Sequence, residues 1–199
     1  MDVKHMIVIM MSAVFVNNYV LSQFLGMCPF LGVSKEIKNA AGMSGAVMFV
    51  MLIATAATWP IQHYILHEKG LDYLQTVVFI LVIAALVQLT KIILKRYIPP
   101  LHDALGVFLP LMVSNCVIFG VTITNINNDY TFFEAVVNAL GAGGGFFLAM
   151  ILFSGIREHT QNADPPPSFK GIPLTLISAA ILSLSFFAFG GVVENLFGH

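Results

Sequence analysis

The sequence predicts an all-α integral membrane protein whose six transmembrane helices form two inverted three-helix repeats. Three observations support this prediction: the apolar composition, six long windows without charge, and motifs that occur once in each half. Of the 199 residues, 58% are hydrophobic and only 10% are charged. Soluble domains carry about 25% charged residues, so this composition excludes an ordinary soluble protein. The net charge of −1 argues against a nucleic-acid partner.

Each charge-free window is near or above the roughly 18–20 residues that cross a bilayer as a helix. The windows cover residues 6–34, 39–62, 73–90, 104–128, 135–156 and 171–193. The connections between them hold the charges and are too short to form a soluble domain. Pro99-Pro100 closes the third span, and the proline-rich turn at 164–168 separates the fifth from the sixth, because proline cannot continue a helix.

The basic residues predict the orientation, because cytoplasmic loops of membrane proteins are enriched in Lys and Arg. With the N-terminus outside, the outer segments hold only Lys4 and Lys69. The inner loops then hold Lys35, Lys38, Lys91, Lys95, Arg96, Arg157 and Lys170. We therefore expect both termini on the outer face of a bacterial cytoplasmic membrane, with the lipid bilayer around the helices.

Two cysteines mark equivalent places in the two halves. Cys28 and Cys116 are each followed, at the same spacing, by a Gly-Val pair. Residues 39–42 (Asn-Ala-Ala-Gly) and 138–141 (Asn-Ala-Leu-Gly) also match. With three spans per repeat, the second repeat enters the membrane in the opposite sense. The single predicted domain therefore divides into repeats at about 1–98 and 99–199, and its pseudo-two-fold axis brings the two cysteines to face each other near mid-membrane.

Helix-interrupting residues surround both cysteines. Gly26, Pro29 and Gly32 lie around the first, and Pro110 and Gly120 lie around the second. Proline lacks a backbone N–H, and glycine permits unusual backbone angles. We expect broken helices over 26–32 and 110–120, because interrupted spans in matching places indicate a midplane site. The alternative is that Gly and Pro are simply frequent in membrane helices.

Two thiols in matching places suggest one shared metal or redox site. A [2Fe–2S] cluster normally takes four thiolates, and the chain has only Cys28 and Cys116. A second polypeptide, most simply a homologous six-span subunit, would have to supply an equivalent pair. Close backbone approach and amide donors would offset the cost of a buried anionic cluster. The candidates for this surrounding role are Gly26, Gly32, Asn115 and Gly120. A closed disulfide and ordinary burial of the thiols are the alternatives.

Other polar side chains lie inside the spans. Asn17 and Asn18 lie in the first span, and Thr122, Thr124 and Asn125 lie in the fourth. Such groups either bond neighbouring helices or line an ion path. The charge-free windows hold no Asp or Glu, whereas a stand-alone ion carrier usually places an ionisable group there. A secondary transporter or channel with the same inverted repeat and merely buried cysteines is the competing interpretation.

Several stretches resemble the RnfA and NqrE family of membrane subunits. They are residues 24–35 around Cys28, residues 105–111 leading into Asn115-Cys116, Gly155-Ile156-Arg157-Glu158, and the proline-rich loop that ends in Phe169-Lys170-Gly171. The resemblance covers essentially the whole chain. Pro29 and Gly32 favour the Rnf branch over the equivalent subunit of the Na⁺-translocating NADH:quinone reductase, which is the alternative.

The resemblance implies a function that composition alone does not. Rnf complexes couple electron transfer between ferredoxin and NAD to the pumping of Na⁺ or H⁺. Two related, oppositely oriented six-span subunits, the second called RnfE, each contribute two cysteines to a [2Fe–2S] cluster within the membrane. Carried over to this chain, the iron ligands are Cys28 and Cys116, and the partners are the other Rnf subunits, among them an RnfE-like protein. Flavin and nicotinamide sites belong to those other subunits, so the resemblance implies an electron relay without a complete active site.

Overall fold

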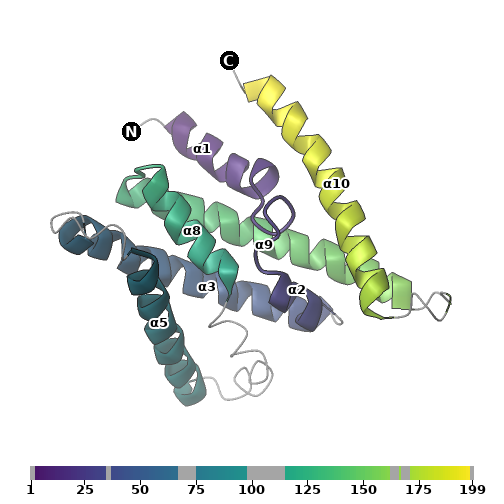
Figure 1. The fold of residues 1–199 in the computed structure, drawn as a ribbon, viewed down its shortest axis with the longest axis horizontal. Coiled ribbons are helices and arrows are strands. Elements are labelled where there is room, and N and C mark those ends of the chain that lie inside the picture. The colour runs from purple at the N-terminus through teal and green to yellow at the C-terminus, as the bar shows by residue number, and fades with distance from the viewer. Residues whose placement is uncertain are drawn as a thin grey trace.

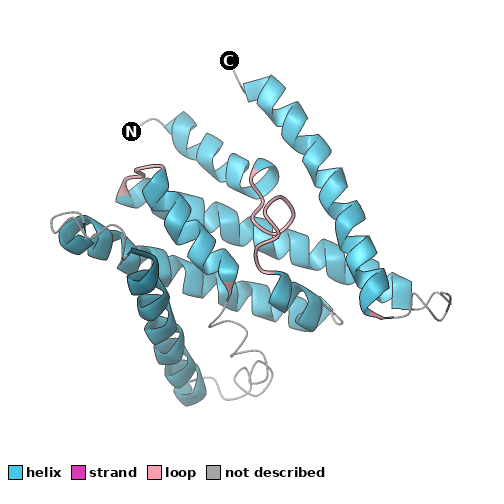
Figure 2. Cartoon of the chain, in the orientation of Figure 1, coloured by secondary structure: helices cyan, strands magenta, loops and turns pink. Residues whose placement is uncertain are grey.

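The computed structural model describes residues 3–34, 37–66, 75–97, 115–161, 166 and 171–197, and every regular element within them is helical (Figure 1; Figure 2). In chain order the elements are α1 (Val3–Met11), η1 (Ser12–Val16), α2 (Met27–Val33), α3 (Ile37–Ile61), η2 (Gln62–Leu66), α5 (Gln75–Tyr97), α8 (Cys116–Asn127), α9 (Phe132–Gln161) and α10 (Ile172–Phe197). The labels η1 and η2 denote short π-helical turns that continue α1 and α3. The all-helical prediction is confirmed for the described residues.

Helices α3 and α9 pack side by side at the centre of the molecule (Figure 1). Their contact is apolar, because Met43 and Met51 of α3 and Phe146 and Phe153 of α9 are each at most 1% exposed. The first span also packs on α9, where a Cβ added at Gly141 would lie 2.9 Å from the carbonyl oxygen of Met10. Glycine therefore lets the first span lie directly against the central helix.

The first charge-free window is interrupted, but not where the sequence predicts. Residues 27–33 are helical, whereas residues 17–26 are irregular. Pro29 is the third residue of α2. The backbone N–H groups of a helix's first turn have no intrahelical acceptor, so proline is tolerated at this position. The predicted break over 26–32 is therefore wrong, and the real break ends at Gly26, just before Cys28. In the second half, α8 is continuous from Cys116 through Gly120, and residues 110–114 lie outside the described residues.

Two described helical stretches are long and apolar enough to cross a membrane, Ile37–Tyr64 and Phe132–Thr160. The other apolar stretches are shorter and cover Met6–Val16, Gln75–Leu89, Cys116–Asn127 and Ile172–Ala188. Each of the six windows thus contains described helix, and two of the described stretches combine the length and the hydropathy that a crossing needs. The first window is shortened by its interruption, and part of the fourth, 104–114, lies outside the described residues.

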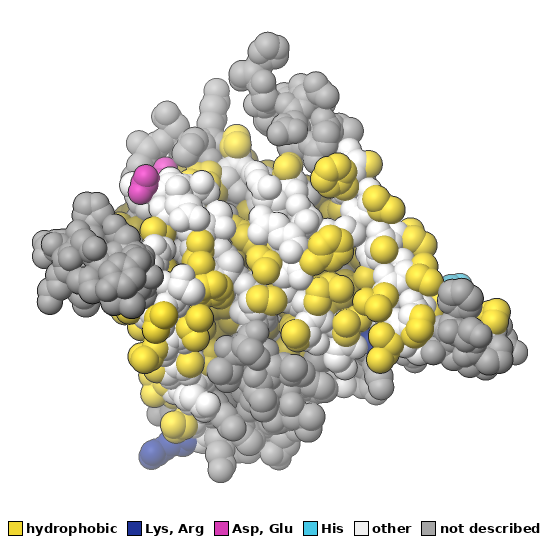
Figure 3. Space-filling model, viewed as in Figure 1, with side chains coloured by type: hydrophobic (Ala, Val, Ile, Leu, Met, Phe, Trp, Pro, Cys, Tyr) yellow, Lys and Arg dark blue, Asp and Glu magenta, His cyan; other side chains and the backbone are white. Residues whose placement is uncertain are grey.

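Hydrophobic side chains cover much of the molecular face seen in Figure 3. The most exposed of the large ones lie on α5 and α10, where Leu81 is 67% exposed, Leu184 71% and Phe187 78%. Soluble monomers rarely expose apolar side chains over such an extent. This surface is typical of helices that face lipid or other apolar helices.

Candidate functional site

The two cysteines lie in the first turns of α2 and α8, two helices whose N-terminal ends are joined by a hydrogen bond. Cys28 is the second residue of α2, and Cys116 is the first residue of α8. The backbone N–H of Gly26 donates a hydrogen bond to Sγ of Cys116, with 2.8 Å between nitrogen and sulfur. Because Gly26 is two residues before Cys28, this bond brings together the cysteine segments of the two halves.

The two thiols differ in exposure. Cys28 is exposed, Cys116 is half-buried, and neither forms a disulfide. Among the described residues, no three His, Cys, Asp or Glu side chains lie close enough together to hold a metal ion. This part of the chain therefore offers at most two sulfur ligands, and one of them lies at the surface, where a second polypeptide could approach it.

Gly26 is the residue whose backbone the site depends on most directly. Its φ of +86° lies in the left-handed region that side chains disfavour. A Cβ at this position would lie 2.5 Å from Cγ2 of Val117 and 3.1 Å from the ring of Phe146. Only glycine can therefore present its amide to the Cys116 sulfur without displacing the start of α8.

Asn115 caps the helix that begins with Cys116. Its Oδ1 accepts a hydrogen bond from the backbone N–H of Val117 at 3.1 Å, as expected at an N-cap. Its Nδ2 is buried and has no hydrogen-bond partner among the described residues. The Gly26 amide donates to the Cys116 sulfur, and α8 begins at this residue with the positive end of its dipole. These groups fit an anionic sulfur ligand.

The other two predicted surrounding residues lie differently. Gly32 is exposed on α2, one helical turn after Cys28. Gly120 lies within α8, and a Cβ there would lie 2.6 Å from Cδ1 of Leu25. Gly120 therefore provides the space in which the irregular segment packs on α8. Through that contact Gly120 lies against the loop that precedes Cys28.

Asn18 holds the irregular segment in place. Its Nδ2 donates to the carbonyl oxygens of Val14 and Gly145, and its Oδ1 accepts from the N–H groups of Val20 and Leu21. The side chain is 1% exposed. Of the two roles left open by the sequence, bonding between helices is the one that Asn18 performs. It anchors the break to α9 and so positions the segment that leads to Gly26 and Cys28.

Arg157 has a structural role that the sequence analysis missed. Its Nη1 donates to the carbonyl oxygen of Leu31 at 2.6 Å and to Oγ of Ser34 at 2.8 Å. These acceptors belong to the last turn and the C-cap of α2, where a cation is favoured by the helix dipole. The ring of Phe30 stacks on Phe153 of α9 with centroids 4.0 Å apart. The helix that carries Cys28 is thus attached to α9 along its length.

The chain is similar throughout to known membrane proteins. A family model described as Rnf-Nqr subunit, membrane protein, matches residues 6–193. The chain belongs to the Rnf-Nqr family. It is 50% identical over 187 residues to the A component of the Na⁺-translocating ferredoxin:NAD⁺ oxidoreductase complex of Acetobacterium woodii, covering 94% of this chain and 97% of that relative. It is 46% identical over 192 residues to the A component of the ion-translocating oxidoreductase complex of Syntrophotalea carbinolica, covering 96% of this chain and 100% of that relative. The corresponding protein of Vibrio parahaemolyticus is 43% identical over 188 residues, covering 94% of this chain and 98% of that relative.

Membership of the Rnf-Nqr family confirms the resemblance found in the sequence and makes this chain a membrane protein. Two of the motifs behind that resemblance, residues 24–34 and Gly155-Ile156-Arg157-Glu158, lie in the described structure and contact each other through Arg157. The motif at 105–111 and the residues Phe169-Lys170 lie outside the described residues.

Proposed function

We propose that this Rnf-Nqr protein belongs to an Rnf-type complex that couples electron transfer between ferredoxin and NAD⁺ to the translocation of Na⁺ or H⁺. In this proposal the chain holds half of an intramembrane [2Fe–2S] cluster, and a homologous RnfE-like subunit holds the other half. The observation that carries it is the hydrogen bond from the Gly26 amide to the Cys116 sulfur. This bond joins the cysteine segments of the two halves while Cys28 stays at the surface.

The residues of the site suit this role chemically. Cys28 and Cys116 would supply two of the four thiolates that a [2Fe–2S] cluster requires, and a bound cluster would allow one electron at a time to pass through the membrane. The Gly26 amide and the unpaired Nδ2 of Asn115 would offset negative charge at the sulfur. Asn18, Arg157 and the Phe30–Phe153 stack would hold the segment that carries Cys28 against α9. The chain is then an electron relay that depends on other subunits for its redox partners.

We propose the same overall topology as the sequence predicts, with six spans in two inverted repeats, 1–98 and 99–199, and both termini on the outer face of a bacterial cytoplasmic membrane. The excess of Lys and Arg in the inner loops supports the orientation. Under this orientation Arg157 and Ser34 lie toward the cytoplasm. Trp59 and Tyr130 lie toward the outer face, where amphipathic aromatic side chains are common.

The names of the relatives favour the Rnf assignment over the Na⁺-translocating NADH:quinone reductase. A secondary transporter with buried, unreactive cysteines is the remaining alternative. Such a transporter would work equally well with serine at both positions, so the cysteines distinguish the two functions.

The test is low-temperature EPR with iron analysis of the purified, reduced complex, in the wild type and in Cys28→Ser and Cys116→Ser. We expect each variant to lose the same [2Fe–2S] signal and two irons while the complex stays assembled. Ser22→Ala, an exposed position in the same irregular segment, serves as the matched control and should keep the signal. An unchanged set of cluster signals in both cysteine variants would contradict the relay function and favour the transporter.

A further inference from the structure

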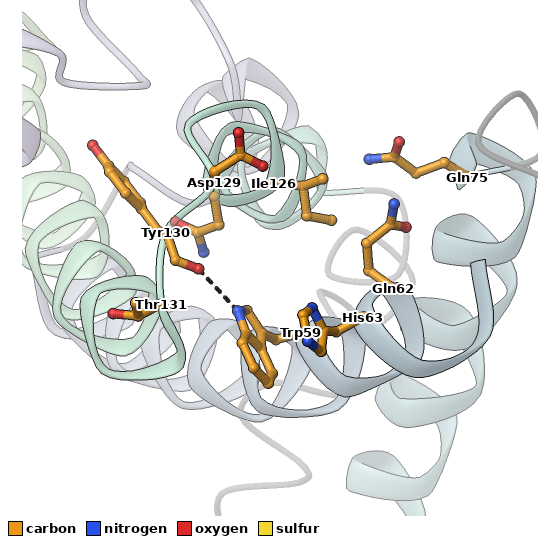
Figure 4. A pocket seen from close by; sticks show the side chains of 9 residues that line it. Trp59, Gln62, His63, Gln75, Ile126, Asp129, Tyr130 and Thr131 are labelled. Carbon is orange, nitrogen blue, oxygen red and sulfur yellow. Dashed lines mark hydrogen bonds between the residues drawn. The ribbon is translucent and has the colours of Figure 1, made fainter. Parts of the chain in front are cut away.

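A second polar site lies at the other end of α8 from Cys116. It is a pocket of about 460 Å³ between the ends of α3 and α8 and the start of α5. The lining residues that bear on its chemistry are Gln62, His63, Gln75, Asn125, Asp129 and Tyr130, and all of these except Asn125 are labelled in Figure 4. Under the proposed topology this pocket opens toward the outer face of the membrane.

The walls of the pocket are fixed by hydrogen bonds between elements. Nε1 of Trp59 donates to the carbonyl oxygen of Tyr130 at 2.9 Å and ties α3 to the loop after α8 (Figure 4). Nδ2 of Asn138 donates to Oδ1 of Asn125 at 2.7 Å and ties α9 to α8. Asn125, one of the polar residues for which an ion path and helix bonding were both open, therefore bonds neighbouring helices. Asn125 also contributes to the lining of the pocket.

The charge of the pocket favours a cation. Asp129 is the one carboxylate among the described lining residues, and none of them is Lys or Arg. The C-terminal, negative end of the α8 dipole lies at Asn127 beside the pocket. Burial, and after it the nearby Tyr19 and, more weakly, Glu134, raise the pKa of Tyr130 above its ordinary value, and a hydrogen bond from Asn128 opposes the rise. Tyr130 thus stays neutral. His63, whose ring stacks on Trp59, is the other titratable side chain of the lining, and the carboxylate of Asp129 is the group that attracts a cation.

Oxygen acceptors are available to receive such a cation. Oε1 of Gln62 is buried and has no hydrogen-bond partner in the described part of the chain. Gln62 begins the π-helical turn η2, and such turns occur frequently at functional sites. The Gln62 and Gln75 amides extend toward the same space in Figure 4, with Asp129 across the view from them. Carboxylate and amide oxygens suit hard cations rather than soft metals.

The size and the single carboxylate indicate a hydrated monovalent ion. Liquid water occupies about 30 Å³ per molecule, so the pocket has room for an ion that keeps part of its hydration shell. Divalent Ca²⁺ usually takes six to eight oxygen ligands, several of them carboxylates. We propose that this pocket is an outward-facing Na⁺-binding site, and that it is a station on the translocation path of the proposed complex.

Helix α8 connects this pocket to the cysteine site. Its 12 residues span about 18 Å, with Cys116 as its first residue and the pocket at its last turn. Negative charge is favoured at the first end and positive charge at the second. Because one rigid element contributes to both sites, a displacement at one end reaches the other. This part of the inference rests on the proposed function, whereas Na⁺ binding by the pocket does not.

Asp129→Asn is the sharpest test, because Asp129 has a φ of +50° and Asn tolerates the left-handed region equally well. The change removes the charge and keeps the backbone. Gln62→Leu removes the unpaired oxygen independently. The matched control is Glu158→Gln, an exposed carboxylate at the opposite end of α9. The measurement is the Na⁺ dependence of ferredoxin:NAD⁺ turnover and ²²Na⁺ binding, both with the purified complex.

We expect the KM for Na⁺ to rise about tenfold in Asp129→Asn and in Gln62→Leu, as for the loss of one charge-assisted contact. The kcat at saturating Na⁺ should stay within about twofold, because that loss weakens ground-state binding, and ²²Na⁺ binding should weaken in parallel. The control should match the wild type. Unchanged ²²Na⁺ binding in both variants would overturn the Na⁺ site. Wild-type turnover that does not respond to Na⁺, or an unchanged KM for Na⁺ in both variants, would overturn its place on the translocation path. EPR of the same samples separates the two proposals, because loss of Na⁺ affinity with an intact cluster signal tests the pocket alone.

Discussion

Gly26→Ala tests whether the contact between the cysteine segments holds the site together. The new Cβ would lie 2.5 Å from Cγ2 of Val117, closer than carbon atoms approach, while φ stays at +86°. A left-handed conformation costs an L-residue roughly 1–2 kcal/mol, and forcing a methyl group into a packed interior costs roughly 1–3 kcal/mol. The combined cost is roughly 2–5 kcal/mol. Relaxation must move Gly26 away from the start of α8, which opens the N–H bond to Cys116.

Thermal unfolding in detergent and iron content per complex measure the two consequences. We expect Gly26→Ala to unfold at a lower temperature and to contain less iron. Gly155→Ala is the matched control, because a Cβ there meets nothing within 4 Å and alanine favours the helix by up to about 1 kcal/mol. The double variant Gly26→Ala/Val117→Ala restores the space but not the backbone preference, so it should recover part of the loss. A Gly26→Ala protein with wild-type unfolding and full iron would refute the reasoning.

Two further substitutions test the surroundings of the cysteines. Arg157→Ala removes the charged donor to Leu31 and Ser34, and we expect a loss of about 2–3 kcal/mol in the free energy of unfolding. The stability of Arg157→Lys should lie between those of the wild type and Arg157→Ala, because one ammonium cannot match the planar guanidinium. Equal stability of all three proteins in a denaturant titration would contradict the role of the contact. Asn115→Asp keeps the acceptor for the Val117 N–H but replaces the unpaired donor beside Cys116 with negative charge. If the cluster is present, its midpoint potential in Asn115→Asp should fall by on the order of 60 mV, a tenfold change for one electron. In Asn115→Ser, whose side chain can also cap the helix, the potential should fall less. Equal potentials in a redox titration followed by EPR would rule out a donor role for Asn115.

The helical fold follows from the composition and the charge-free windows. Long windows without charge indicate segments that lie in lipid, and in lipid the backbone N–H and C=O groups must bond to one another within regular structure. The position of the break does not follow. A proline inside an apolar window disrupts a helix if it lies in the interior and is tolerated in the first turn. Which of these applies to Pro29 depends on where α2 begins. That start is set by the left-handed Gly26 and by Asn18, whose carbonyl partner in Gly145 is remote in the sequence.

The cysteines could be singled out from the sequence because they recur with the same neighbours in both halves, and their role as iron ligands stays a prediction. Arg157 could be identified only as a family motif and as an inner charge, because its acceptors lie at the end of a different helix. The pocket at Gln62 and Asp129 has no sequence signature, since its residues come from three helices and a loop. Local patterns therefore predict the elements and the thiols, whereas long-range contacts decide how the thiols are presented.

The unequal exposure of the two cysteines has a consequence for how such a protein is made. The Cys116 sulfur is already oriented by a hydrogen bond within its own chain, whereas Cys28 is left open. A copy synthesised without a covering polypeptide would display an accessible thiol, and accessible thiols are the ones that oxidise first. If the two cysteines hold the proposed cluster, half of the ligand geometry is built by folding and the other half by assembly. In the proposed complex, balanced synthesis of the partner subunit would protect the Cys28 thiol from oxidation before the cluster is assembled.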